Sequence, residues 1–153
     1  LLQPQSDWAA LRQAQADALA LPKTGMATAI DIGNPTDIHP KNKQEVGRRL
    51  ALLSLKNTYG KKNIVDKAPV VKKCTFADGQ ATIAFSNKVS VKNGDTPMGF
   101  IVENADGTFS RGTAKLQSNN TVIVKTDKSG KPRSVRYNWA DYPDGNLYGA
   151  NDR

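Results

Sequence analysis

Turn signals divide the second half of the chain at short intervals, and this pattern constrains the fold more than any other feature of the sequence. Asp, Asn or Ser precedes Gly or Asn at positions 78–79, 93–94, 106–107, 119–120 and 129–130. The runs between them are short and enriched in β-branched or aromatic residues: 70–76, 80–85, 88–92, 99–103, 121–126 and 135–139. Short strands joined by such turns are typical of antiparallel sheets. We therefore predict a small antiparallel β-sandwich over residues 63–153.

The first sixty residues follow a helical pattern instead. Apolar residues recur at helical spacing after Ser6, a predicted N-cap, until Pro22 stops the run. We expect Trp8 and Leu11 to be buried anchors of this helix. A second helix is predicted to begin near residue 40 and to end at a C-cap provided by Gly60.

Residues 24–33, TGMATAIDIG, lie between these helices and read as a strand buried on both faces. Helix, strand and helix together predict an α/β unit over residues 1–62. A single strand with open edges does not make a stable α/β domain. Either this unit packs against the β half, or the rest of its sheet lies on another polypeptide. The chain opens on Leu1 rather than Met, and we expect it to be part of a longer protein.

The chain carries a net charge of +8, which raises the possibility of nucleic-acid binding. Residues 1–62 hold nine basic and five acidic side chains, and residues 63–153 hold thirteen and nine, so the charge is spread evenly. A nucleic-acid site usually concentrates its charge in a stripe with aromatic residues. We therefore predict no nucleic-acid partner. The sequence lacks the run of about 20 apolar residues that a membrane span requires, so we predict no membrane span. Cys74 is the only cysteine, so a cysteine-based metal cluster is not expected. No cofactor is predicted.

One short loop carries candidate catalytic residues. His39 is the only histidine in the chain, and Asp37 precedes it by two residues. A catalytic imidazole needs a carboxylate on one ring nitrogen, which leaves the other nitrogen to take a proton from a nucleophile. On spacing alone the signal is weak, because a sequence of this kind is more often a turn in which Asp37 caps the following helix and His39 is a surface residue.

The sequence around this loop closely resembles the end of the catalytic domain in sialate O-acetylesterases and their relatives among the GDSL/SGNH hydrolases. The resemblance lies in residues 8–15, 24–27, 31–33, 37–44, 46–52 and 59–60, and above all in the block DIHPKNKQ at 37–44. Residues 135–141 and 146–148 are similar to the β-rich region that follows the catalytic part. The implied fold is the C-terminal fragment of an SGNH-type α/β/α hydrolase domain followed by a small antiparallel β-sandwich.

The resemblance implies that His39 is the general base of a serine esterase, with Asp37 as the third member of the triad. The wider family places this acid three residues before the histidine, where Thr36 stands here, so Asp31 or an acid outside the chain remains an alternative. The blocks that carry the family's serine nucleophile and oxyanion hole are absent from this sequence. The implied partners are an O-acetylated sugar, in particular sialic acid, and the remaining catalytic segment of the same protein. The implied location is secreted, periplasmic or lysosomal.

Two further readings concern sugar recognition. Arg48 or Arg49 is an alternative partner for the carboxylate of a sialic acid, although pairing with nearby acids is the simpler expectation. The aromatic residues near the C-terminus are expected to fill the core; alternatively, they make the β half a non-catalytic carbohydrate-binding module. These residues are Tyr137, Trp139, Tyr142 and Tyr148.

Overall fold

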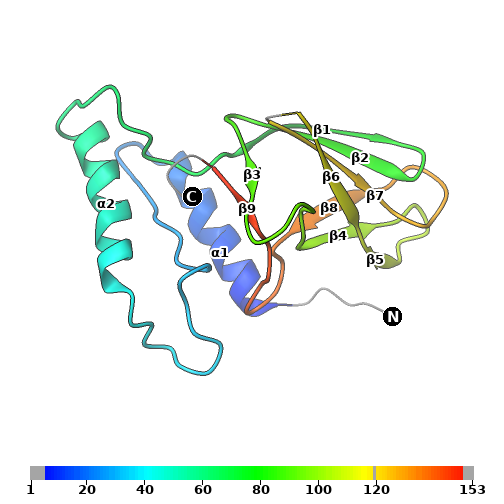
Figure 1. The fold of residues 1–153 in the computed structure, drawn as a ribbon, viewed down its shortest axis with the longest axis horizontal. Coiled ribbons are helices and arrows are strands. Elements are labelled where there is room, and N and C mark those ends of the chain that lie inside the picture. The colour runs from blue at the N-terminus through cyan, green and yellow to red at the C-terminus, as the bar shows by residue number, and fades with distance from the viewer. Residues whose placement is uncertain (1–5, 119, 150–153) are drawn as a thin grey trace. The chain divides into compact units, whose positions relative to one another are not determined.

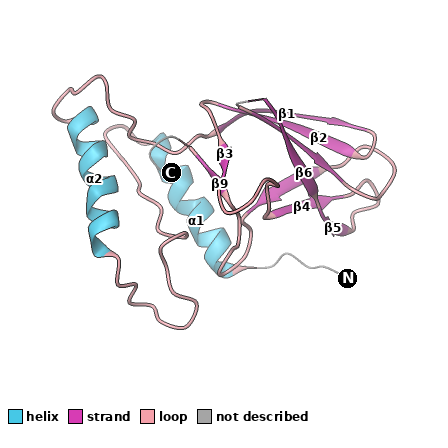
Figure 2. Ribbon diagram, viewed as in Figure 1, coloured by secondary structure: helices cyan, strands magenta, loops and turns pink. Residues whose placement is uncertain are grey.

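The computed structural model describes residues 6–118 and 120–149 (Figure 1). The described chain forms two compact units that divide between Lys67 and Ala68, a few residues beyond the boundary predicted at 62/63. The first unit, Asp7–Lys67, is helical. The second unit contains every strand of the described residues (Figure 2).

Two helices and one 3-10 turn make up the helical unit: α1 (Asp7–Asp17), η1 (Ala18–Ala20) and α2 (Lys43–Asn57). The side chain of Asn42 caps α2 by accepting a hydrogen bond from the Glu45 amide at 3.1 Å. After α2, Gly60 has a φ of +66°, as predicted for a residue that reverses the chain after a helix. Both predicted helices are therefore present, and the second begins at Lys43 rather than at residue 40.

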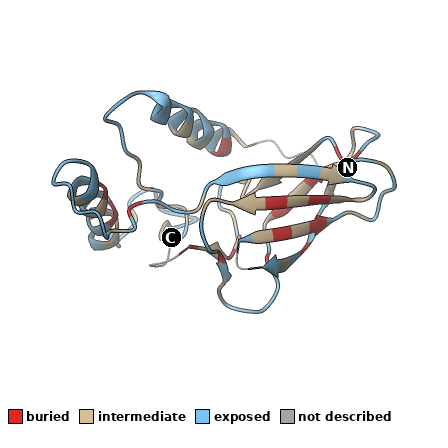
Figure 3. Ribbon diagram, turned by 90° about the horizontal axis from the view of Figure 1, so that it is seen from above, coloured by how far each residue is buried: buried red, intermediate tan, exposed pale blue. Residues whose placement is uncertain are grey.

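Two other predictions for this unit are wrong. Residues 24–33 form no strand; within this segment the Ile32 amide donates to the Ala29 carbonyl at 3.2 Å, which closes a turn. A strand needs a neighbour to satisfy its backbone groups, and the described part of this unit offers none. Trp8 and Leu11 are 56% and 48% exposed rather than buried. Figure 3 shows that both helices are largely exposed.

Three antiparallel sheets make up the second unit, as the turn pattern predicts. A four-stranded sheet has the order β1-β2-β7-β6, a three-stranded sheet has the order β5-β4-β8, and β3 pairs with β9. The strands are β1 (Val71–Ala77), β2 (Gln80–Phe85), β3 (Ser90–Val91), β4 (Phe100–Glu103), β5 (Phe109–Arg111), β6 (Thr113–Ser118), β7 (Thr121–Lys125), β8 (Ser134–Tyr137) and β9 (Leu147–Tyr148).

One apolar cluster is shared by the two larger sheets. Alternate residues of β2 and β7 point inward, as expected for strands with one buried face, and Figure 3 shows buried residues recurring along these strands. Residues of β4 and β6, together with Val89 just before β3, complete the cluster. Its buried members are Ile83, Val89, Phe100, Val102, Ala114, Val122 and Val124.

Three strands, β5, β6 and β9, were not predicted. β6 has the sequence TAKLQS, whose apolar content is low, and it forms an edge of the four-stranded sheet with one buried residue, Ala114. β5 and β9 have three and two residues, too few for a periodic signal. The predicted turn at 119–120 falls partly outside the described residues, because Asn119 is not among them.

Candidate functional site

The Asp37–His39 loop brings a carboxylate and an imidazole together. Asp37 Oδ1 lies 3.2 Å from His39 Nδ1 and also accepts a hydrogen bond from the His39 amide at 2.8 Å. The side chain of His39 is 81% exposed and that of Asp37 is 44% exposed. In the described part of the chain, Asp37 is the one side chain that bonds the ring, and no hydroxyl group does so.

The local sequence explains why this loop holds its shape. An Asp or Asn side chain readily accepts a hydrogen bond from the amide two residues later. Asp37 does so with His39. Immediately before it, Asn34 Oδ1 accepts from the amide and the hydroxyl of Thr36 at 2.9 and 3.0 Å. Two successive side-chain turns therefore position the imidazole without help from a neighbouring strand.

A buried arginine ties the segment before the loop to α2. The side chain of Arg49 is only 6% exposed. Its Nη1 and Nη2 atoms each donate to one carboxylate oxygen of Asp31, at 2.7 Å, and Nη1 also donates to the Thr28 carbonyl at 2.7 Å. Its Nε atom donates to Glu45 at 2.8 Å. This network fixes residues 28–31 against α2, and the loop that holds Asp37 and His39 follows directly in the sequence.

Hydrogen bonds within this network shift the pKa values of Glu45 and Arg49. Hydrogen bonds from Arg48, and next from Arg49, lower the pKa of Glu45 from its usual 4.5 to about 2. The hydrogen bond to Asp31 is the largest cause of a raised pKa for Arg49. Arg49 is thus a structural residue and not one that faces a substrate, and Arg48 pairs with Glu45 at 2.6 Å.

Asp37 is consequently a better candidate than Asp31 for the acid beside His39. Both carboxylate oxygens of Asp31 are bonded to Arg49, whereas Asp37 contacts the imidazole directly. The sequence analysis expected Arg49 to pair with nearby acids, and it does so with Glu45 and Asp31. The spacing of four residues between Glu45 and Arg49 on a helix signals their pairing, but nothing in the sequence indicates the contact with Asp31.

The described residues hold no group of three or more His, Cys, Asp or Glu side chains placed to bind a metal ion. Neither α1 nor α2 is long and apolar enough to cross a membrane, and the same is true of every helix in the described ranges.

No family model matches the chain, but two known proteins are similar to it. The chain matches the crystal structure of a carbohydrate acetylesterase from Xanthomonas citri with a TM-score of 0.90 and 42% identity, over 99% of this chain and 35% of that one. It is also 29% identical over 132 residues to the sialate O-acetylesterase of Mus musculus, which is 80% of this chain and 24% of that protein.

The predicted resemblance to sialate O-acetylesterases and related carbohydrate acetylesterases is therefore confirmed. Both proteins are much longer than the segment that matches: the chain spans less than two thirds of either.

Proposed function

We propose that this chain is the part of a carbohydrate O-acetylesterase that supplies the general base, His39, and its acid partner, Asp37. The observation that carries the proposal is the 3.2 Å contact between Asp37 Oδ1 and His39 Nδ1. It occurs in a chain similar to two proteins whose names describe them as acetylesterases of carbohydrates.

The reaction uses a serine that lies outside this chain. As the serine Oγ attacks the acetyl carbonyl carbon, His39 Nε2 takes its proton, and Asp37 stabilises the resulting imidazolium. His39 then returns the proton to the departing sugar oxygen, and the acetyl group stays on the serine. Water next attacks this acyl-enzyme, giving its proton to Nε2, and acetate leaves as the serine recovers a proton.

The helical unit is, in this proposal, the end of an SGNH-type hydrolase domain, and the β unit is the β-sandwich that follows it. Apolar side chains exposed on the helical unit support the first half of this assignment, because a part of the protein outside the chain would cover them. They include Trp8, Leu11, Leu21 and Leu50, which are 48–62% exposed. A sialic acid ester is the proposed substrate, and the proposed location is secreted, periplasmic or lysosomal.

The test is acetate release from O-acetylated sialic acid by the parent protein that contains this chain. We expect His39→Ala to lower kcat by about 10²–10⁴-fold, the usual contribution of a general base. Asp37→Ala is expected to lower kcat as well. Asp17→Ala is the matched control, since it removes an exposed carboxylate from the same unit. Full activity of the His39→Ala protein would refute the proposal. If the protein released acetate only from other acetylated sugars, the proposed esterase activity would stand and only the proposed substrate would be wrong.

A further inference from the structure

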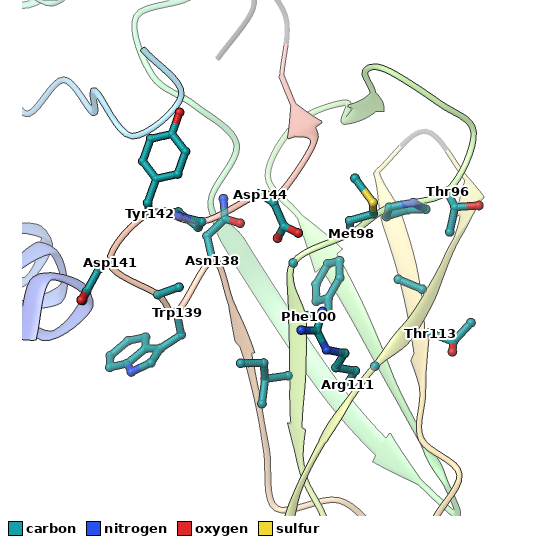
Figure 4. Close-up of a pocket in the computed structure, with 17 residues that line it drawn as sticks. Thr96, Met98, Phe100, Arg111, Thr113, Asn138, Trp139, Asp141, Tyr142 and Asp144 are labelled. Carbon is teal, nitrogen blue, oxygen red and sulfur yellow. The ribbon is translucent and has the colours of Figure 1, made fainter. Parts of the chain in front are cut away.

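The β unit contains an open groove of about 670 Å³, a size within the range of roughly 300–1,000 Å³ common for small-molecule sites. One side is formed by residues 138–144, which follow β8, and the other by residues 96–101 and 111–114. Figure 4 shows Trp139, Asp141 and Tyr142 along the first side, with Thr96 and Thr113 on the second. Every residue that lines the groove belongs to the β unit, whereas His39 belongs to the helical unit.

Two aromatic rings line the groove without filling the core. Tyr142 is 54% exposed, contrary to its predicted place in the core, whereas Tyr137 packs against the core as predicted. The ring of Trp139 is half-buried, and the guanidinium carbon of Arg136 lies 5.3 Å from its centroid. This cation–π contact holds the indole in place.

The two sides of the groove are pinned to one another, so its shape is present before any ligand binds. Asn146 is buried; its side chain accepts from the Met98 amide at 2.8 Å and donates to the Thr96 carbonyl at 3.1 Å. The Asn138 amide donates to the Gly99 carbonyl at 2.9 Å. A preformed site avoids the entropic cost of ordering loops around a ligand.

The polar groups of the groove are suited to hydroxyl groups. The carboxylate of Asp144 is exposed and forms no salt bridge within the described residues, and the same holds for the guanidinium of Arg111. Carboxylates accept hydrogen bonds from hydroxyls, and guanidinium groups donate to them. Asp141 adds a second carboxylate, so acidic groups outnumber Arg111 and an anionic ligand is disfavoured.

We propose that this groove is a binding site for a neutral oligosaccharide. A sugar ring has an apolar face of C–H groups, which packs on an aromatic ring, and a rim of hydroxyls that needs donors and acceptors. Trp139 and Tyr142 supply the aromatic surface, and Asp144, Arg111 and Thr96 supply the polar contacts. The site lies on the β unit, and its ligand binding does not depend on the esterase chemistry proposed for His39.

Tryptophan fluorescence tests this site directly, because the chain has only two tryptophans, Trp8 and Trp139. In the Trp8→Phe protein, emission reports on the groove alone. We expect saturable changes in emission on titration with at least one of cellotetraose, xylotetraose or mannotetraose. The Trp139→Phe protein, whose only remaining tryptophan is Trp8, should show no such change. Calorimetry of the unmodified chain gives the affinity independently of fluorescence.

Tyrosine variants identify the binding surface. Tyr142→Ala should weaken binding by about tenfold, the energy scale of one aromatic packing contact. Tyr59→Ala, which removes a 69% exposed tyrosine from the helical unit, should not change it. Absence of binding by all three sugars, tighter binding of sialyllactose, or equal affinity of the Tyr142→Ala protein would overturn the proposal. Because the readout is binding, its failure is distinct from a failure of the proposed esterase activity.

Discussion

His39 shows how a carboxylate two residues away in the sequence can fix the state of an imidazole. Which ring nitrogen of a neutral histidine carries the proton depends on the hydrogen-bond partners of the two nitrogens, because an acceptor beside one nitrogen favours the proton on that nitrogen. Asp37, an acceptor within 3.2 Å of Nδ1, favours the form with the proton on Nδ1. That form presents an unprotonated Nε2 to solution, as a general base requires.

The first prediction concerns this tautomer. Because the chain has one histidine, ¹⁵N chemical shifts of the imidazole can be assigned without ambiguity at a pH where the ring is neutral. We expect the Nδ1–H form to dominate in the unmodified chain and to lose that dominance in the Asp37→Ala protein. Asp17→Ala, the control, should leave the spectrum unchanged. Identical tautomer populations with and without Asp37 would show that the contact does not orient the ring.

Arg49 and Arg48 provide a second prediction, because they are adjacent but differ in burial. The side chain of Arg49 is 6% exposed and that of Arg48 is 42% exposed. Arg49→Met leaves the carboxylate of Asp31, whose side chain is 18% exposed, without the two hydrogen bonds from the guanidinium, and we expect a loss of about 1–3 kcal/mol in the free energy of unfolding. Arg48→Met should change it by no more than about 1 kcal/mol. Urea denaturation followed by helix circular dichroism measures both; equal losses would contradict the network.

The pKa of Glu45 makes a third prediction. Bonds from Arg48 and then Arg49 lower this pKa from 4.5 to about 2 in the folded chain. A carboxylate with a lowered folded pKa contributes stability above its unfolded pKa and loses it as the pH falls through the folded value. The helical unit should therefore lose stability between about pH 4.5 and pH 2. In acid denaturation, the stability of the Glu45→Gln protein should depend less steeply on pH over this range. Parallel curves for the two proteins would exclude this contribution.

At the scale of elements, the sequence pattern predicted those strands and turns whose formation depends on neighbouring residues in the chain. β2 and β7 alternate inward and outward residues, and the Asp78-Gly79 turn joins β1 to β2 as expected. The strand predicted at 24–33 failed because its apolar composition says nothing about whether a neighbour is present. The Asp37–His39 contact spans two residues and was predictable. The groove beside Trp139 was not, because it joins segments some forty residues apart in the sequence.

The loop between β4 and β5 contains a buried polar residue that gives the fourth prediction. Asn104 is 1% exposed, accepts from Thr126 Oγ1 at 2.8 Å and donates to Thr108 Oγ1 at 3.2 Å. Asn104→Ala leaves these hydroxyls without their shared partner, and we expect a loss of about 1–3 kcal/mol in the free energy of unfolding. Asn87→Ala, at an exposed position of the same unit, is the control. Urea denaturation should show a lower free energy of unfolding for the Asn104→Ala protein and an unchanged one for the Asn87→Ala protein.

At the scale of the whole molecule, the two units differ in how much apolar surface each buries by itself. Seven buried apolar residues of the β unit form one cluster. In the described part of the helical unit, only Ala9 and Leu53 are buried apolar residues, and the other buried side chains are those of Arg49 and Asp66. Apolar burial is the dominant favourable term in folding, so the β unit should be stable by itself and the helical unit should depend on contacts outside its own residues.

The last prediction follows from this contrast. A protein of residues 68–153 should unfold cooperatively and keep an antiparallel β spectrum, because its cluster draws on both larger sheets. A protein of residues 7–67 should have little helix in water, since two short helices without a shared apolar interior are marginal. Circular dichroism and urea denaturation of the two fragments test this directly. If the 7–67 fragment gains helix when mixed with the preceding part of its parent protein, but not with the 68–153 fragment, then the apolar surface around Trp8 and Leu11 serves the catalytic domain. A stable, cooperative 7–67 fragment would show instead that the Arg49 network suffices to hold the helices, and that the exposed apolar side chains play no part in folding.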